Sequence, residues 1–148
     1  KEVRGKLFDR LARLGCDTSR VMLSGPVPGL ANHLASLAQV DIALDAYPYH
    51  GTTTTCECLW MGVPVVTLAG ERHASRVGVS LLTSVGAEDL IATSPEAYVE
   101  KAVALARDRA ALARWRRNLR PRMQASPLTD NVRFAANLEA GYRRMVDQ

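Results

Sequence analysis

The sequence predicts an α/β domain built on a parallel sheet, because helix-like and strand-like segments alternate along its first two thirds. Two short apolar runs, residues 40–45 and 65–68, have the length and composition of buried strands. A helix-like segment precedes each of them, over residues 30–39 and 52–61. This alternation is typical of a parallel sheet with helices packed on its faces.

The other elements of this part are shorter. Residues 3–14 carry apolar side chains at helical spacing and end at Gly15, so we expect a first helix there. Residues 20–23 form a short β-prone run that leads into a loop rich in proline and glycine. A further helix is expected over residues 73–84, and residues 85–92 form a connection with room for one more strand.

The C-terminal third has only helical patterns. Ser94 and Pro95 are the residue types that favour an N-cap and a first helical position. A basic helix is expected over residues 109–123, and Asp130 caps a last helix. An apolar stripe follows one face of that helix, at Phe134, Leu138, Tyr142 and Met145.

We expect one domain over residues 1–148, with an α/β part over about 1–93 and a helical part over about 94–148. The content of 47% hydrophobic and 23% charged residues is that of a globular protein with a core, which excludes a disordered chain. No apolar run approaches the roughly 20 residues that span a bilayer. The sequence therefore indicates a soluble, cytoplasmic protein, and the absence of an initial Met indicates part of a longer one.

The net charge of +4 raises the question of a nucleic-acid partner. Much of the excess lies in one run of arginines: Arg107, Arg109, Arg114, Arg116, Arg117, Arg120 and Arg122. No RNA-binding or DNA-binding motif accompanies this run, so we expect no nucleic acid. A solvated or domain-docking helical face is the favoured interpretation, ahead of a membrane surface or an acidic partner.

The three cysteines predict neither a disulfide nor a metal site. Cys16, Cys56 and Cys58 are odd in number and form no CxxC motif. On a helix, residues two apart point about 200° away from each other, so Cys56 and Cys58 cannot readily share a metal. We expect the cysteines to be small buried thiols.

The candidate ligand site is the segment Gly51-Thr-Thr-Thr-Thr55, which lies between the end of a strand and the start of a helix. Open parallel sheets bind ligands at this edge, and free backbone N–H groups at a helix start attract phosphate. Four consecutive β-branched residues are poor helix formers, which favours a binding role for Thr52, Thr53 and Thr54. The alternative, given equal weight, is that the threonines only cap the helix.

Two further side chains extend this site. Glu57 follows Thr53 by one turn, so its carboxylate could accept hydrogen bonds from ribose hydroxyls beside a diphosphate; the alternative is a surface residue. His33 follows the loop that contains Pro28, whose backbone groups could read the edge of a base. A lone histidine is more often structural than ligand-binding. Together these features describe a site for a nucleoside diphosphate.

The motifs that are absent narrow the class of site. The sequence has no GxGxxG and no GxxxxGK[ST], so neither a dinucleotide-binding fold nor a P-loop is supported. No acidic pair stands beside the threonines to hold a divalent metal. We expect a site without metal or cofactor, in which a helix N-terminus and hydroxyls neutralise the diphosphate.

A series of motifs runs in order through nearly the whole chain: Asp41-Ile-Ala-Leu-Asp45, Gly51-Thr-Thr-Thr54, Leu59-Trp-Met-Gly-Val-Pro-Val-Val-Thr67, Gly70-Glu71, Ala74-Ser-Arg-Val77 and Ser126-Pro-Leu128. The series closely resembles the C-terminal catalytic region of the O-linked N-acetylglucosamine transferase family. It looks like a bacterial member, and such proteins usually carry tetratricopeptide repeats before the catalytic region. The resemblance implies a GT-B architecture, with this chain as the Rossmann-like C-terminal lobe that binds the donor.

The resemblance implies metal-independent, inverting transfer of GlcNAc from UDP-GlcNAc to Ser or Thr of an acceptor protein. Thr53 and Thr54 match the family's diphosphate-binding threonines, and Glu57 stands where the family has a ribose-binding Asp. His33 matches a histidine that packs on uracil, and the Pro28 region matches the loop that pairs with the base. The resemblance places no catalytic residue in this chain, so the other lobe and the repeats are expected partners and the chain alone is expected to be inactive.

Departures from the family's pattern leave the donor open. Thr52 replaces a histidine, and Leu30 and Ser36 stand where animal members have a lysine and an arginine beside the uracil. Relatives that use UDP-glucose or GDP-fucose are therefore alternatives. A non-catalytic module that binds nucleotide sugars or another protein is the alternative from a different functional class.

Overall fold

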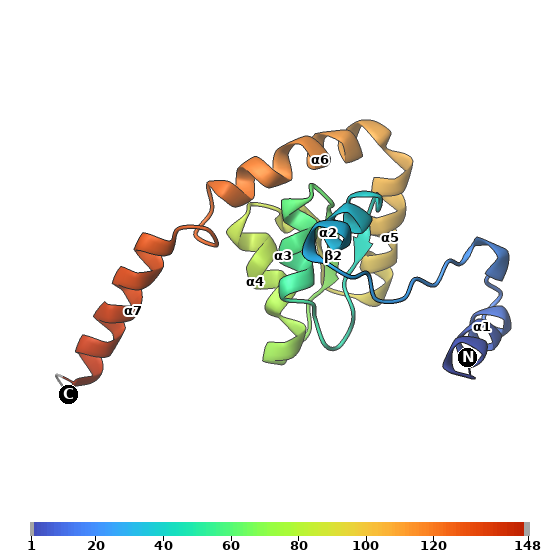
Figure 1. Cartoon of the computed structure of the whole chain (residues 1–148), viewed down its shortest axis with the longest axis horizontal. Helices are drawn as coiled ribbons and strands as arrows, with labels where there is room; N and C mark the ends of the chain where they lie inside the picture. Colours follow the sequence, from blue (N-terminus) through green and yellow to red (C-terminus); the bar gives the residue numbers. More distant parts are fainter. Residues whose placement is uncertain (1, 147–148) are drawn as a thin grey trace.

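The computed structural model describes residues 2–146, and for side chains residues 3–146, and it contains a three-stranded parallel sheet (Figure 1). The strands are β1 (Ala43–Leu44), β2 (Val65–Leu68) and β3 (Ile91–Ala92), in the spatial order β1-β2-β3. All neighbouring strands are parallel. The sheet is narrow, and only β2 has neighbours on both sides.

Helices make up most of the described chain. Their bounds are α1 (Glu2–Arg13), α2 (Leu30–Ala38), α3 (Thr53–Trp60), α4 (Val77–Ser84), α5 (Pro95–Arg107), α6 (Arg109–Gln124) and α7 (Asn131–Val146). Short 3₁₀ turns lie at Thr18–Arg20, His73–Ser75 and Glu88–Leu90. No helix among these residues is long and apolar enough to cross a membrane.

The helices cover the sheet on both sides. Figure 1 shows α3 and α4 on one side of β2 and α5 on the other, and α6 runs along the top of the body, where it contacts α3 and α5. The core lies between these layers; its hydrophobic members that are fully shielded from solvent are Leu59, Val63, Val66, Leu82, Ala87, Ala92 and Leu119. The packing therefore fixes the start of α3 and the carboxyl ends of the strands relative to each other.

The elements around β2 confirm the sequence prediction. The strand at Val65–Leu68 and the helix at Thr53–Trp60 lie where they were expected. The N-cap prediction also holds, because the hydroxyl oxygen of Ser94 accepts a hydrogen bond from the backbone N–H of Ala97. The expected strand over residues 40–45 is present but shorter.

Two predictions differ from the structure. Residues 20–23 form no strand: Met22 is 86% exposed and no strand lies beside this run, so a β-prone sequence lacks the hydrogen-bonding partner that a strand requires. The expected helix over residues 73–84 is interrupted at Arg76, whose backbone leaves the helical region between the 3₁₀ turn and α4.

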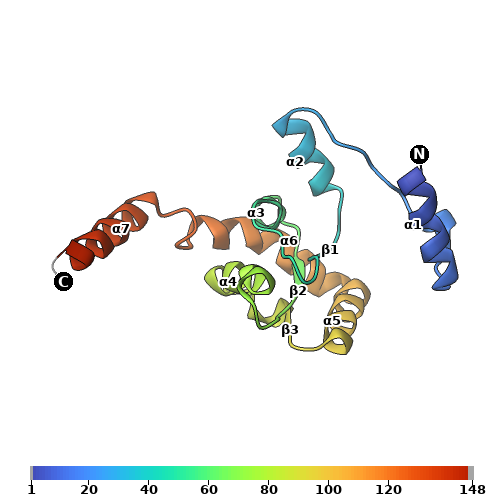
Figure 2. The same cartoon turned by 90° about the horizontal axis from the view of Figure 1, so that it is seen from below.

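The first and last helices project from opposite sides of the body (Figures 1 and 2). Their apolar faces predicted the helices correctly but are not buried: Val3 is 82% exposed, Phe134 66% and Met145 72%. The helix α1 contacts the 3₁₀ turn at Thr18–Arg20, and most of the apolar side chains on the two faces remain exposed. The amphipathic spacing thus predicted the two helices correctly, but it did not predict that their apolar faces would be exposed.

The basic helix α6 holds other helices of the same chain. Three of its arginines donate hydrogen bonds to backbone carbonyls at or just after the ends of α2, α3 and α4. The pairs are Arg116 with Ala38 and Val40, Arg120 with Trp60, and Arg122 with Gly86. A cation at a helix C-terminus is favourable because the helix dipole is negative there. This part of the basic face therefore docks within the domain, whereas Arg114 and Arg117 are exposed.

Candidate functional site

A cavity of about 540 Å³ lies beside the edge strand β1 and the start of α3. Its lining includes the end of β1, the loop residues Tyr49, His50 and Gly51, and the four threonines 52–55. The structure thus brings Gly51, Thr52, Thr53 and Thr54 together at the edge where parallel sheets present ligand sites.

The threonine hydroxyls do little capping. Thr52 is the N-cap residue of α3, yet its side chain accepts no capping hydrogen bond. Thr55 donates its hydroxyl proton to the carbonyl oxygen of Gly51, at 3.0 Å. The hydroxyls of Thr53 and Thr54 have no hydrogen-bond partner within residues 2–146 and border the cavity. The capping interpretation therefore leaves the side chains of Thr52, Thr53 and Thr54 without a role.

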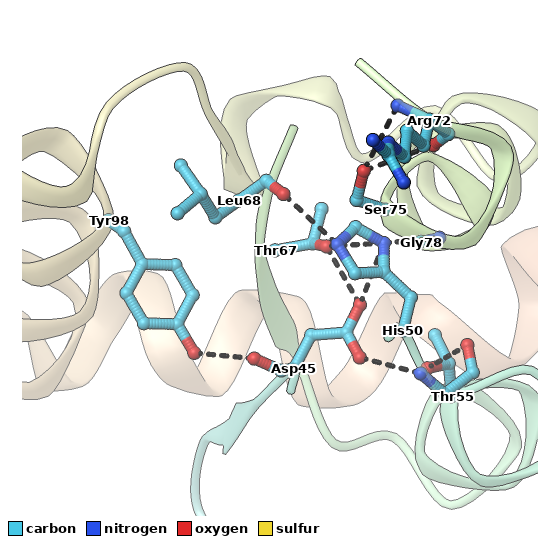
Figure 3. Close-up of polar contacts among 10 residues, drawn as sticks. Asp45, His50, Thr55, Thr67, Leu68, Arg72, Ser75, Gly78 and Tyr98 are labelled. Carbon is cyan, nitrogen blue, oxygen red and sulfur yellow. Dashed lines mark hydrogen bonds and ion pairs between the residues drawn. The ribbon is translucent and has the colours of Figure 1, made fainter. Parts of the chain in front are cut away.

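A buried polar network supports this loop (Figure 3). The side chain of Asp45, which follows β1, is 3% exposed. One carboxylate oxygen accepts from the backbone N–H of Gly51 at 2.9 Å, and the other accepts from the hydroxyl of Thr67 at 2.7 Å. Asp45 thus ties the loop before α3 to the central strand β2.

His50 occupies the middle of the network. Its Nε2 lies 3.0 Å from the carbonyl oxygen of Leu68, which can only accept, so Nε2 carries a proton. Its Nδ1 lies 3.0 Å from the backbone nitrogen of Gly78, which donates, so Nδ1 carries the lone pair. The geometry therefore requires the neutral imidazole with its proton on Nε2.

Gly78 lets the start of α4 approach this network closely. A Cβ atom at this position would stand 2.4 Å from the carboxylate of Asp45 and 2.5 Å from the hydroxyl of Thr67. Only glycine leaves room for both groups. The backbone N–H of His50 also donates to the carbonyl of Ala74, at 2.9 Å, so two segments join here.

Tyr98 extends the network across the sheet. Its hydroxyl, on α5, donates to the backbone carbonyl of Asp45 at 2.9 Å (Figure 3). Burial raises the pKa of the Tyr98 hydroxyl, and the negative charge of Asp45 adds to the effect. The phenol therefore stays protonated at neutral pH and serves as a donor.

His33 and Glu57 form a second, separate pair. The Nε2 atom of His33 on α2 lies 3.0 Å from a carboxylate oxygen of Glu57 on α3, and both side chains are partly exposed. Pro28 lies in the irregular segment before α2, where its carbonyl accepts from the side chain of Asn32. Neither Pro28, His33 nor Glu57 borders the cavity of the threonines, so the structure places the expected site residues in two adjacent groups.

The sequence reasoning missed most of the supporting network. Asp45 ends the motif Asp41-Ile-Ala-Leu-Asp45, but the sequence alone assigned it no role. Thr67 and Tyr98 lie 22 and 53 residues after Asp45 in the chain. One signal in the sequence could have predicted this network: a polar residue, Asp45 or Thr67, lies at the end of each of two buried strands. Such residues meet at one edge of a parallel sheet. No group of three or more potential metal ligands occurs among the described residues.

The cysteines give a simple check on this region. Burial raises the pKa of the Cys58 thiol, with further contributions from the charges of Glu57 and Asp45. Cys58 is 4% exposed, whereas Cys16 is exposed. We expect iodoacetamide near neutral pH to label Cys16 first and Cys58 only on unfolding, as read by peptide mass spectrometry. Equal labelling rates in the folded chain would contradict the structure.

The sequence profile of glycosyl transferase family 41 matches residues 4–138. The chain belongs to glycosyl transferase family 41. Similar family-41 relatives are the SPINDLY proteins of tomato and rice, described as probable UDP-N-acetylglucosamine–peptide N-acetylglucosaminyltransferases. They are 46% and 47% identical over 143 residues, which is 97% of this chain and 15% of each relative.

A solved family-41 structure agrees with the fold. The chain superposes on a mutant O-GlcNAc transferase from Thermobaculum terrenum with a TM-score of 0.89 and 41% identity, over 95% of this chain and 27% of that one. This match confirms the expected Rossmann-like lobe of a GT-B glycosyltransferase. The chain spans about a sixth of the length of the plant relatives that it matches.

Proposed function

We propose that this chain is the donor-binding part of an inverting, metal-independent glycosyltransferase that transfers GlcNAc from UDP-GlcNAc to Ser or Thr of proteins. The observation that carries the proposal is the group of unpartnered hydroxyls at the start of α3, on the wall of a cavity in a family-41 lobe. The names of the plant relatives give the same donor and a peptide acceptor for those proteins.

The diphosphate would bind at the start of α3. The backbone N–H groups of Thr53 and Thr54 precede the first internal hydrogen bond of this helix, so they are free to donate to phosphate oxygens. The adjacent hydroxyls add donors, and the positive end of the helix dipole adds charge stabilisation. These groups do what a divalent cation does in other transferases, which is the basis for proposing a site without a metal.

The nucleoside would bind beside α2. The carboxylate of Glu57 is an acceptor for ribose hydroxyls, and its contact with His33 holds the imidazole one turn beyond the threonines. The imidazole would pack on the base, with the Pro28 segment along the base edge.

The acceptor protein, the second lobe and the repeats complete the enzyme in this proposal. We place the reaction in the cytoplasm, a compartment in which the three unpaired cysteines stay reduced.

The test is calorimetric titration with UDP, GDP and their sugar conjugates, first without metal and then with Mg²⁺. We expect UDP-GlcNAc to bind without metal, and we expect Thr53→Ala with Glu57→Ala to weaken binding at least tenfold. Thr83→Ala with Glu100→Ala, at exposed positions on α4 and α5, is the matched control and should bind as the unchanged protein does.

Each other outcome has a defined meaning. If GDP conjugates or UDP-glucose bound more tightly than UDP-GlcNAc, the proposed donor would be wrong and the proposed binding site would stand. Strict dependence on Mg²⁺ would overturn the metal-independent mechanism. Donor binding by the complete protein without any transfer to peptides would favour the non-catalytic module. Absence of binding by the folded complete protein would overturn the proposed function.

A further inference from the structure

We propose that Arg116, on α6, is a positioning residue for the nucleoside part of the donor: it fixes α2, the helix that carries His33, relative to α3, which carries Glu57. This inference rests on the proposed function. It concerns a side chain that lies outside the cavity and that has no place in the binding steps described above.

Helix α2 packs on α3 through side chains that are only partly buried. None of its residues is buried, and residues 21–28 before it have no regular structure. Leu37 packs against the core, and His33 contacts Glu57 across a partly exposed surface. A helix attached only through partly exposed side chains takes a more defined position when a further bond fixes its end.

Arg116 supplies that constraint at the far end of α2. Its two terminal nitrogens donate to the carbonyl oxygen of Val40 at 2.6 Å and to that of Ala38 at 3.0 Å. These carbonyls lie at and just after the last turn of α2, where the negative end of the helix dipole favours a cation. His33 lies about 7.5 Å from Ala38 along the helix axis at 1.5 Å per residue, so a shift at this end moves the imidazole directly.

The backbone of Arg116 is itself seated against the end of α3. Gly62 follows α3 with a φ of 75°, and a Cβ atom there would stand 2.6 Å from the carbonyl oxygen of Arg116. Arg116 therefore approaches Gly62, just after the end of α3, through its backbone and holds the end of α2 through its side chain. One residue sets the separation of the two helices whose side chains, His33 and Glu57, meet at 3.0 Å.

The planar guanidinium suits this task. It presents two N–H groups at once to two carbonyls, whereas a lysine ammonium at the same position satisfies them less well and without fixed orientation. Arg116→Lys should therefore retain part of the effect, and Arg116→Ala should lose all of it.

The experiment measures the UDP and GDP affinity of the complete protein that carries this chain, by calorimetry well below each variant's melting temperature. We expect Arg116→Ala to weaken binding of the preferred nucleotide at least tenfold and Arg116→Lys to give an intermediate loss. Arg122→Ala is the matched control, because it removes an equivalent bond at the end of α4 and lowers stability without touching α2. Arg117→Ala, an exposed neighbour, controls for net charge.

A double-variant cycle tests whether Arg116 acts through α2. After His33→Ala, adding Arg116→Ala should weaken binding by less than about twofold more, because the side chain that Arg116 positions is already absent. The inference would be overturned if the losses of affinity in His33→Ala and Arg116→Ala multiplied in the double variant. It would also be overturned if Arg116→Ala and Arg122→Ala lost affinity equally, or if Arg116→Ala left the affinity unchanged. Failure of the unchanged protein to bind either nucleotide would instead overturn the proposed function on which it rests.

Discussion

Asp45→Ala is expected to lower the free energy of unfolding by about 3 kcal/mol, because it leaves two buried donors without an acceptor. The carboxylate accepts from the N–H of Gly51 and from the hydroxyl of Thr67, and the side chain is 3% exposed. Relief of the desolvation of a buried charge offsets part of the loss. The loop at Gly51 should loosen as well, so nucleotide affinity should fall with stability.

Chemical denaturation followed by tryptophan fluorescence measures this change, since Trp60 and Trp115 both pack against the core. Asp45→Asn is the matched control. Its amide oxygen keeps one acceptor for Gly51 N–H, so its loss should be clearly smaller than that of Asp45→Ala. A loss below about 0.5 kcal/mol in Asp45→Ala would show that the network does not support the fold.

Leu59→Ala is expected to cost about 3 kcal/mol of stability for a different reason, the loss of packing. Leu59 is fully shielded at the centre of the core, on the same helix as the threonines. Truncation removes apolar contacts and leaves a cavity that the surrounding layers fill only in part. Because Leu59 lies on the core side of α3, the remaining folded molecules should bind nucleotide with unchanged affinity.

Val99→Ala provides the comparison for Leu59→Ala. Val99 lies on α5 and is 59% exposed, so its truncation should change stability by less than about 0.5 kcal/mol. Equal losses at the two positions would mean that the core is not where the structure places it. Both measurements use the same denaturation experiment and need no ligand.

The sequence predicted the elements that rest on local patterns. The strand Val65–Leu68 and the helix Thr53–Trp60 agree with the prediction because each carries local signals: a continuous apolar run for the strand, and hydroxyl residues at the start and Gly62 just after the end for the helix. Residues 20–23 have the same β-prone composition without a neighbouring strand, and no local signal reports a missing partner. The roles of the α6 arginines likewise depend on carbonyls 36 to 78 residues away, which spacing along one helix cannot reveal.

The candidate site likewise contains residues that a local pattern predicts and residues that no local pattern predicts. The threonines and Gly51 could be identified because a helix start after a strand is a local feature with a known chemistry. His50 could not be assigned, since its side-chain partners come from β2, from α4 and from Asp45 after β1. A histidine buried in a network and a histidine facing a ligand have the same sequence signature until the fold brings their neighbours together.

The hydroxyl of Tyr98 joins α5 to the backbone carbonyl of Asp45 at the end of β1, and the carboxylate of Asp45 accepts from Gly51 just before α3. The backbone N–H of Gly78 on α4 donates to His50 in the same network. The backbone that borders the cavity is thus tied to both helical layers before any ligand arrives. Its conformational entropy is lost during folding and not during association, so a ligand needs to order little protein when it enters. We expect such a site to act as a preorganised template, with little change of its backbone between the free and bound states.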